Sequence, residues 1–321
     1  MQDYFDISSI ENDYDLVVVG GGPAGCVAAL YASRDALKTL VVEKVSPGGM
    51  MSTTSEVDNH PGHPDALSGI ELSELYHKHA KKYGAHFKNA ACTGLEIDGK
   101  MKLIHLEGRD KPIRAKAVIL ATGSIPRKLN VPGEDKFLGR GVSTCGTCDG
   151  SFFSGKAVAA VGGGSTALEE SDYLTRFASK VYLIHRRKEF RGDQALQHLV
   201  KNNPKIELIL DTVVTGINGY TSLNSVSLKN VLTGEEKSLP VDGVFVFIGQ
   251  VPSVEPFKDL FNKNEEGFIL ADESTKTNIP GVFVAGDLRA KPIRQIATAV
   301  ADGAVAAKMA TKYMQENVFT G

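Results

Sequence analysis

The chain is poor in cysteine, with four residues (Cys26, Cys92, Cys145 and Cys148) in 321. Their irregular spacing does not match the framework of a small secreted domain held together by disulfides. A chain of this length with 42% apolar residues can bury a sizeable core without such bridges, and its length suggests about two domains. We therefore expect a soluble globular protein in a reducing compartment.

The sequence also lacks an excess of either charge, since 36 Lys and Arg residues oppose 38 Asp and Glu residues. No basic run is interleaved with aromatic residues, so we expect no nucleic-acid partner. No Lys or Arg precedes Arg34, which does not fit a secretory signal. Apolar runs such as Cys26 to Ala32 and Val244 to Ile248 are too short to span a membrane. These absences predict a cytoplasmic protein without a membrane partner.

A glycine-rich turn follows the valine-rich run Leu16 to Val19 and precedes a helical pattern. In this G-x-G-x-x-G arrangement, the first glycine permits a tight turn and the second lets a pyrophosphate approach the backbone. The third lets the helix pack closely on the strand, and the helix N-terminus then holds the phosphates. The sequence predicts a dinucleotide site that includes Gly20, Gly22, Pro23, Ala24 and Gly25.

A carboxylate stands at the end of the next predicted strand, where Thr39 to Val42 leads into Glu43. An acid at this distance from the glycine turn accepts hydrogen bonds from the hydroxyls of an adenosine ribose. The combination of strand, turn, helix and acid favours a nucleotide site over a plain glycine-rich turn. We expect this first site to prefer FAD or NAD.

The same pattern returns after the predicted strand Ala157 to Val161, with alanine in the third glycine position. Glu43 lies 23 residues after Gly20, and the same offset from Gly162 arrives at His185, which begins a basic cluster. Guanidinium groups pair with a 2′-phosphate, so the second site should prefer NADPH, although a solvated charge run at a strand end is the alternative. The predicted residues are Gly162, Gly164, Ser165, Thr166, Ala167, His185, Arg186, Arg187 and Arg191.

Two cysteines are separated by two small residues in the segment Cys145-Gly146-Thr147-Cys148-Asp149. Cys148 lies fourteen residues before Gly162. A C-x-x-C pair lowers the pKa of one thiol while its partner resolves a mixed disulfide, and Asp149 can move protons. Half of a zinc site and a pair of buried apolar residues are the alternatives. Structural zinc needs four ligands, and Cys26 and Cys92 lack the spacing, so we expect no metal.

The arrangement of these segments predicts an α/β protein with two Rossmann-like dinucleotide-binding domains, the second inserted into the first. We expect the FAD-binding domain over residues 1–123 and 253–321 and the NADPH-binding domain, with the cysteine pair, over residues 124–252. The last strand of the FAD-binding domain ends in Gly286-Asp287, and Arg294-Gln295 leads into a long helix of small residues.

Together these motifs resemble the low-molecular-weight, FAD-dependent thioredoxin reductases, from Tyr14 to the last helix. The resemblance implies electron transfer from NADPH through FAD and the cysteine pair to the disulfide of thioredoxin or a similar small protein, in a homodimer. It implies that Cys145 exchanges with thioredoxin, Cys148 faces the flavin and Asp149 protonates a leaving thiolate. The remaining FAD-site residues are Gly49, Met50, Asn59, Ala121, Thr122, Gly123, Gly286, Asp287, Arg294 and Gln295.

The sequence departs from the family pattern at Met50, where glutamine is usual, and at Ser165, where asparagine or aspartate is commoner. The first change removes one hydrogen bond to the flavin ring. Relatives that take electrons from ferredoxin lack the arginine cluster, so its presence favours NADPH. The alternatives are a dithiol flavoprotein with ferredoxin as donor or another disulfide as acceptor, and a redox sensor that does not turn over.

The disulfide and the nicotinamide site share the inserted domain, yet both must reach one flavin. We therefore expect this domain to rotate about its two linkers, near residues 123–126 and 249–252.

Overall fold

The computed structural model describes residues 6–45, 47–54, 56–57, 59–65, 67–257 and 259–319. The chain divides into two compact units: unit 1 is Met1–Ile125 with Val251–Gly321, and unit 2 is Pro126–Gln250. The boundaries expected from the sequence, after residue 123 and before residue 253, lie close to these.

Unit 1 is built on a seven-stranded sheet in the order β3-β2-β1-β6-β5-β4, with β17 also paired to β6. Pairing is parallel among β1, β2, β3, β6 and β17 and antiparallel along β4, β5 and β6. The central strands are continuous apolar runs because both of their faces are covered. The strands are β1 Asp13–Val19, β2 Thr39–Glu43, β3 His86–Asn89, β4 Cys92–Asp98, β5 Met101–Leu106, β6 Ile113–Leu120 and β17 Val282–Val284.

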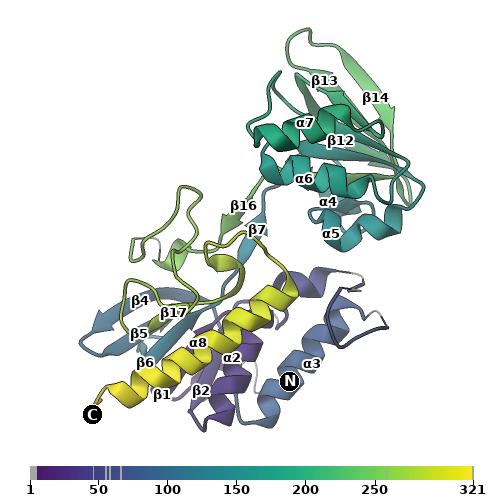
Figure 1. The fold of residues 1–321 in the computed structure, drawn as a ribbon. Coiled ribbons are helices and arrows are strands. Elements are labelled where there is room, and N and C mark those ends of the chain that lie inside the picture. The colour runs from purple at the N-terminus through teal and green to yellow at the C-terminus, as the bar shows by residue number, and fades with distance from the viewer. Residues whose placement is uncertain are drawn as a thin grey trace. The chain divides into compact units, whose positions relative to one another are not determined.

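Three helices pack in unit 1: α2 Pro23–Arg34, α3 Gly69–Lys82 and α8 Ile296–Glu316. Figure 1 shows α8 running beside α2. Gly303 allows this approach, because a Cβ there would lie 2.2 Å from the carbonyl oxygen of Ala24. A Ser68–Glu71 capping box starts α3. The short 3₁₀ helices are η1 Ile7–Ser9, η2 Gly49–Thr53, η4 Glu255–Phe257 and η5 Gly286–Leu288.

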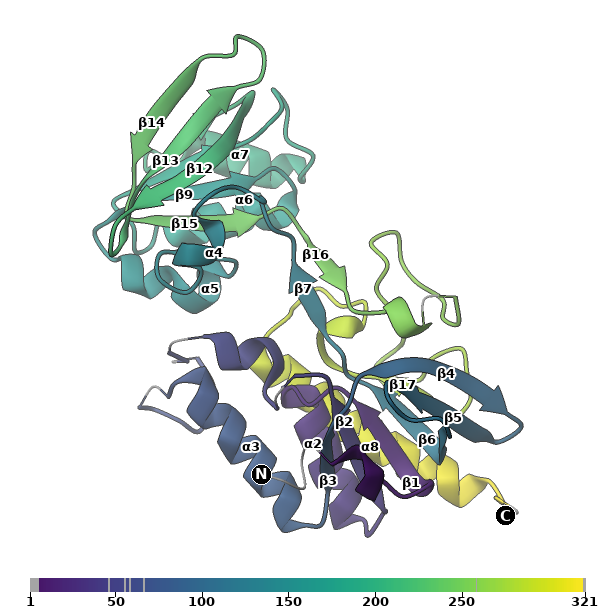
Figure 2. The ribbon, with the colours of Figure 1, turned by 180° about the vertical axis from the view of Figure 1, so that it is seen from behind.

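Unit 2 contains a five-stranded sheet in the order β11-β10-β9-β15-β8, in which every pair is parallel. A three-stranded antiparallel sheet, β12-β13-β14, accompanies it and is visible in Figure 2. The strands are β8 Val142–Ser143, β9 Ala157–Gly162, β10 Lys180–Ile184, β11 Ile206–Ile209, β12 Thr212–Gly219, β13 Leu223–Asn230, β14 Glu236–Pro240 and β15 Gly243–Phe247. The helices are α4 Glu134–Phe137, α5 Gly146–Asp149, η3 Gly150–Phe153, α6 Ser165–Leu174 and α7 Gln194–Asn202.

Two paired segments carry the chain between the units. The strands β7 (Ser124–Pro126) and β16 (Gln250–Pro252) form a two-stranded sheet. Each is preceded by a glycine with positive φ, +70° at Gly123 and +100° at Gly249, a region that residues with a Cβ avoid. Across the described residues, no helix combines the length and apolar character that crossing a bilayer requires.

Candidate functional site

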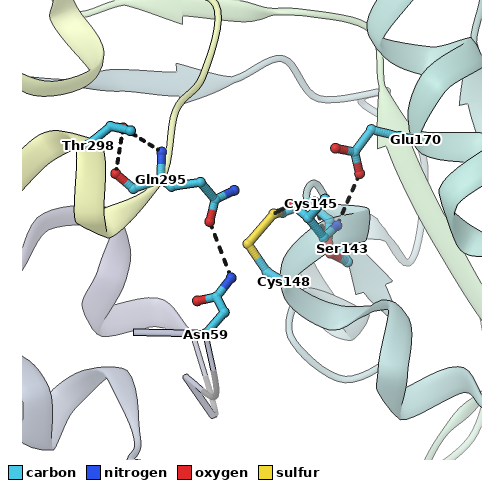
Figure 3. Close-up of a disulfide and its surroundings, with 8 residues drawn as sticks. Asn59, Ser143, Cys145, Cys148, Glu170, Gln295 and Thr298 are labelled. Carbon is cyan, nitrogen blue, oxygen red and sulfur yellow. Dashed lines mark hydrogen bonds between the residues drawn. A yellow bond between two sulfur atoms is a disulfide. The ribbon is translucent and has the colours of Figure 1, made fainter. Parts of the chain in front are cut away.

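The predicted redox pair is a disulfide: Cys145 and Cys148 are bonded, with their Cα atoms 5.3 Å apart. Cys145 is the N-cap of the short helix α5, and Cys148 lies within it. Ser143 fixes the entry to this turn, since its Oγ accepts the N–H of Cys145 at 3.1 Å and donates to the Cys145 carbonyl at 3.2 Å. The disulfide therefore sits at the carboxyl end of β8, on backbone held by short-range hydrogen bonds (Figure 3).

Asp149, predicted as the acid, closes the same turn. Its N–H donates to the carbonyl of Cys145 at 3.2 Å, and its side chain is half-buried directly after Cys148.

Glu170 is a residue at this turn that the sequence analysis did not identify. It lies on α6, its Oε2 accepts the N–H of Thr147 at 3.1 Å, and its carboxyl group also accepts the N–H of Gly146. Burial raises the pKa of Glu170, while these two backbone hydrogen bonds act in the opposite direction. The two N–H groups are among those that a helix leaves without intrahelical partners at its N-terminus.

The glycine turn of unit 1 has the backbone geometry that its motif predicts. Gly20 has φ of +109°, and a Cβ there would lie 2.3 Å from the carbonyl oxygen of Ala121. A Cβ on Gly25 would lie 1.8 Å from the carbonyl oxygen of Gly20, so strand and helix meet without a side chain between them. No side chain caps α2, whose N-cap is Gly22 and whose first residue is Pro23. This N-terminus can receive phosphate.

Glu43 ends β2 beside that turn. Its Oε2 accepts the N–H of Gly21 at 2.7 Å, and its Oε1 accepts the N–H of Val45 at 3.2 Å. Each carboxylate oxygen has a second acceptor position, so Glu43 can bind ribose hydroxyls while its backbone bonds hold it in place.

The loop residues predicted for FAD lie around the same unit. Gly49 lies close to the first glycine turn, since a Cβ added to it would lie 3.3 Å from the Cα of Gly22. The side chain of Met50 is exposed. Asn59 donates to Oε1 of Gln295 at 3.2 Å, and Figure 3 shows these two side chains pointing toward one another. Gln295 is also the N-cap of α8.

Ala121, Thr122 and Gly123 follow β6. Ala121 is buried against the first glycine turn. Thr122 Oγ1 donates to the carbonyl of Ser253 at 2.7 Å, which joins the two linkers where they leave unit 1.

Among the buried side-chain atoms of unit 1 that have no hydrogen-bond partner in the described residues are Oδ1 of Asp287 and Nε of Arg294. Burial raises the pKa of Asp287, and Lys291 Nζ lies 3.7 Å from its Oδ1. The guanidinium of Arg294 lies 4.0 Å above the ring of Phe268. Buried polar groups are normally satisfied, so these atoms fit a bound polar ligand with hydroxyl and acceptor groups such as FAD.

A buried ion cluster, also absent from the sequence analysis, supports the Gly286-Asp287 turn. Asp302 of α8 accepts the N–H of Gly286 at 3.1 Å, pairs with Arg289 at 2.8 Å and pairs with Lys291 at 3.1 Å. The turn carrying Asp287 is thus fixed to the last helix of the unit.

The second glycine turn lies in unit 2, between β9 and α6. A Cβ on Gly162 would lie 2.4 Å from the carbonyl oxygen of Phe247, whereas Gly164 has open space around its Cβ position. Ser165 Oγ donates to Asp193 at 3.0 Å, Thr166 is exposed, and Ala167 is buried under the turn. The open position at Gly164, next to the N-terminus of a ten-residue helix, fits a dinucleotide phosphate.

The basic cluster borders this second turn, but its members differ. His185 is buried, its ring lies 2.2 Å from the Cβ position of Gly163, and its Nε2 lies 3.2 Å from the carbonyl oxygen of Glu189. Burial and the nearby arginines lower the pKa of His185, so it is neutral at pH 7. Arg186, Arg187 and Arg191 are exposed and supply the positive charge.

The family pattern described as pyridine nucleotide-disulphide oxidoreductase matches residues 14–303. A thioredoxin reductase of Listeria innocua is 43% identical over 311 residues, 97% of both chains. One from Bacillus subtilis is 43% identical over 309 residues, 96% of this chain and 97% of its own. The crystal structure of thioredoxin reductase from Streptococcus pyogenes has a TM-score of 0.90 at 39% identity and covers 96% of this chain and 100% of its own. These matches confirm the resemblance and the α/β fold class inferred from the motifs.

Proposed function

Because the chain belongs to the pyridine nucleotide-disulphide oxidoreductase family, we propose that it is a flavoprotein that passes electrons from NADPH to the disulfide of thioredoxin. The observation that carries this proposal is the Cys145–Cys148 disulfide, formed in the same unit as a glycine turn bordered by three exposed arginines. A bound FAD would supply the chemistry that links hydride transfer from the nicotinamide to two-electron reduction of this disulfide.

FAD would be held in unit 1 by the first glycine turn, with phosphates at the start of α2 and ribose hydroxyls on Glu43. Asp287 and Arg294 would satisfy their buried polar atoms on the cofactor. The remaining proposed contacts are Gly49, Met50, Asn59, Ala121, Thr122, Gly123, Gly286 and Gln295.

NADPH would be held in unit 2, with its pyrophosphate at Gly162, Gly164 and the start of α6. Arg186, Arg187 and Arg191 would pair with the 2′-phosphate as guanidinium forks. His185 shapes the wall behind Gly163, because it is buried and neutral.

The chemistry at the pair is thiol–disulfide exchange. Cys145 as thiolate attacks one sulfur of the thioredoxin disulfide, and the other thioredoxin sulfur leaves and takes a proton, which Asp149 can supply. Cys148 as thiolate then attacks Cys145 Sγ, which re-forms the disulfide and releases the second thioredoxin sulfur to be protonated. Two electrons and two protons pass to thioredoxin.

The direct test is NADPH oxidation by the FAD-loaded protein with and without added thioredoxin. We expect a steady-state rate that requires thioredoxin and is lost in Cys145→Ser and Cys148→Ser. A rate that depends on reduced ferredoxin or on another disulfide would replace this proposal, and flavin reduction without turnover on any acceptor would indicate a redox sensor.

We also propose that the protein is cytoplasmic, since a thiol pair that is reduced in each cycle fits a reducing compartment. We propose a homodimer because the family resemblance implies one. Light scattering of the FAD-loaded protein measures the assembly, and a monomer mass at micromolar concentration would contradict it.

A further inference from the structure

The redox turn is short and starts at a cysteine. Helix α5 covers Gly146–Asp149, and Cys145 is its N-cap. Backbone N–H groups at a helix N-terminus have no partner inside the helix, and they stabilise an anion placed there. When such N–H groups stabilise the thiolate of a cysteine that precedes the turn, they lower the pKa of its thiol.

In this protein the groups are already occupied. Oε2 of Glu170 accepts the N–H of Thr147 at 3.1 Å, and the Glu170 carboxyl group also accepts the N–H of Gly146. The approach is close, because a Cβ on Gly146 would lie 2.4 Å from that oxygen. Figure 3 shows the Glu170 side chain reaching from α6 toward the turn.

The Glu170 side chain is half-buried, so a charge on its carboxylate is poorly screened by water. Among the residues that the structure describes, Glu170 makes no ion pair with a basic side chain. The acidic neighbour that acts on it is Glu169, also on α6. The Glu170 carboxyl group therefore occupies two amides that would otherwise be available to an anion beside Cys145.

We propose that Glu170 is a positioning residue of the redox pair, whose carboxylate withholds the amides of Gly146 and Thr147 from the Cys145 thiolate formed on reduction. Without these two amides as partners, the Cys145 thiolate keeps more of its nucleophilicity, because the nucleophilicity of a thiolate rises with the pKa of its thiol. The two cysteines carry out the exchange, and Glu170 sets how Cys145 reacts.

Helix α6, which carries Glu170, also starts at the end of the second glycine turn. Ser165, the first residue of α6, follows Gly164, and Glu170 lies further along the same helix. Glu170 thus ties the helix proposed to receive the NADPH pyrophosphate to the turn that carries the disulfide. This deepening rests on the proposed function for its meaning, but the thiol chemistry can be measured without it.

The test measures the pKa of Cys145 in a Cys148→Ser background, from the pH dependence of alkylation by iodoacetamide, followed by mass spectrometry. We expect Glu170→Gln, which keeps the shape and removes the charge, to lower the pKa of Cys145 by about one unit. Glu170→Ala frees both amides and should lower it at least as far. Glu169→Gln, on the neighbouring exposed position, is the matched control and should shift it much less.

An equal pKa for Cys145 in the parent and in Glu170→Gln would overturn the inference, as would an equal shift in Glu169→Gln. If Glu170→Ala fails to fold, Glu170→Asp provides the second measurement, since it keeps the charge and should keep the parent pKa. Thioredoxin-dependent NADPH oxidation is recorded separately on the variants that retain Cys148. Absence of this activity in the protein with both cysteines intact would reject the proposed function and leave the thiol result standing.

Discussion

The carboxylate of Glu43 accepts a 2.7 Å hydrogen bond from the backbone N–H of Gly21, although the two residues belong to different segments of unit 1. The second unit places the His185 ring against Gly163 in the corresponding position. One fold pattern thus presents an acid in one unit and a neutral wall bordered by arginines in the other, and this difference underlies the first two predictions.

Replacing Glu43 by Ala should weaken FAD binding about tenfold or more, because charge-assisted hydrogen bonds contribute about 1.5–3 kcal/mol each. Titration of FAD into the apoprotein, followed by quenching of flavin fluorescence, measures the effect. Glu74→Gln, at an exposed position of α3, is the control and should bind as the parent does. Equal affinities in the parent and Glu43→Ala would remove Glu43 from the ribose site.

Replacing Arg186 or Arg187 by Ala should raise the KM for NADPH about tenfold and leave the KM for NADH nearly unchanged, because only NADPH carries the 2′-phosphate. Steady-state rates with both nucleotides separate the two effects. Lys188→Ala, an exposed neighbour in the same loop, is the comparison. A parallel loss with both nucleotides would indicate damage to the shared site and contradict the assignment of the 2′-phosphate.

A cross-link engineered between the two units should stop turnover while sparing one half-reaction, because the disulfide and the proposed nicotinamide site lie on one unit and would both have to reach a flavin held by the other. Stopped-flow spectroscopy distinguishes flavin reduction by NADPH from reoxidation by thioredoxin, and cleavage of the cross-link should restore the cycle. Single-site variants carrying the reagent at one end are the controls. Full turnover in the cross-linked protein would rule out the rotation.

Cys26 and Cys92 should resist alkylation at pH 8. Burial raises the pKa of the Cys26 thiol to about 12 and that of Cys92 to about 11, so both stay protonated and unreactive below those values. Mass spectrometry after reduction and iodoacetamide treatment should find the label on Cys145 and Cys148. Rapid labelling of Cys26 in the folded protein would show that helix α2 opens at its start.

Gly303→Ala should destabilise unit 1. Alanine favours a helix over glycine by about 1 kcal/mol, but its Cβ would lie 2.2 Å from the carbonyl oxygen of Ala24, and overpacking of this kind costs about 1–3 kcal/mol. Because the contact is with backbone, we expect a lower Tm in thermal unfolding followed by circular dichroism. Ala301→Ser, exposed on the same helix, should have little effect.

Local motifs carry much of the fold in the sequence. The strand before Gly20 and the helix after it follow from apolar runs and turn residues, and the structure extends the strand back to Asp13. Residues of the site that depend on distant contacts are different in kind. Glu170 looks like an ordinary helical acid until α6 packs on the redox turn, and nothing local signals it except its place in a Glu169-Glu170 pair.

The buried cluster around Asp302 was missed for the same reason, since its partners Arg289 and Lys291 lie on a loop whose course only the tertiary structure fixes. His185 shows the reverse case. Its position in the repeat was predicted, but the burial of its ring against Gly163 depends on the close approach of β10 to the glycine turn.

The pairing of β17 with β6 and the packing of α8 on α2 have a consequence for synthesis on the ribosome. Every strand of unit 2 lies between residues 126 and 250, so this unit can complete its sheets while the final segment is still being translated. Unit 1 has to wait for β17 and α8 before its sheet and its glycine turn are covered. Domains fold as units during translation. We therefore expect the nascent chain to carry a folded unit 2 while the sheet of unit 1 still lacks β17 and is not yet covered by α8.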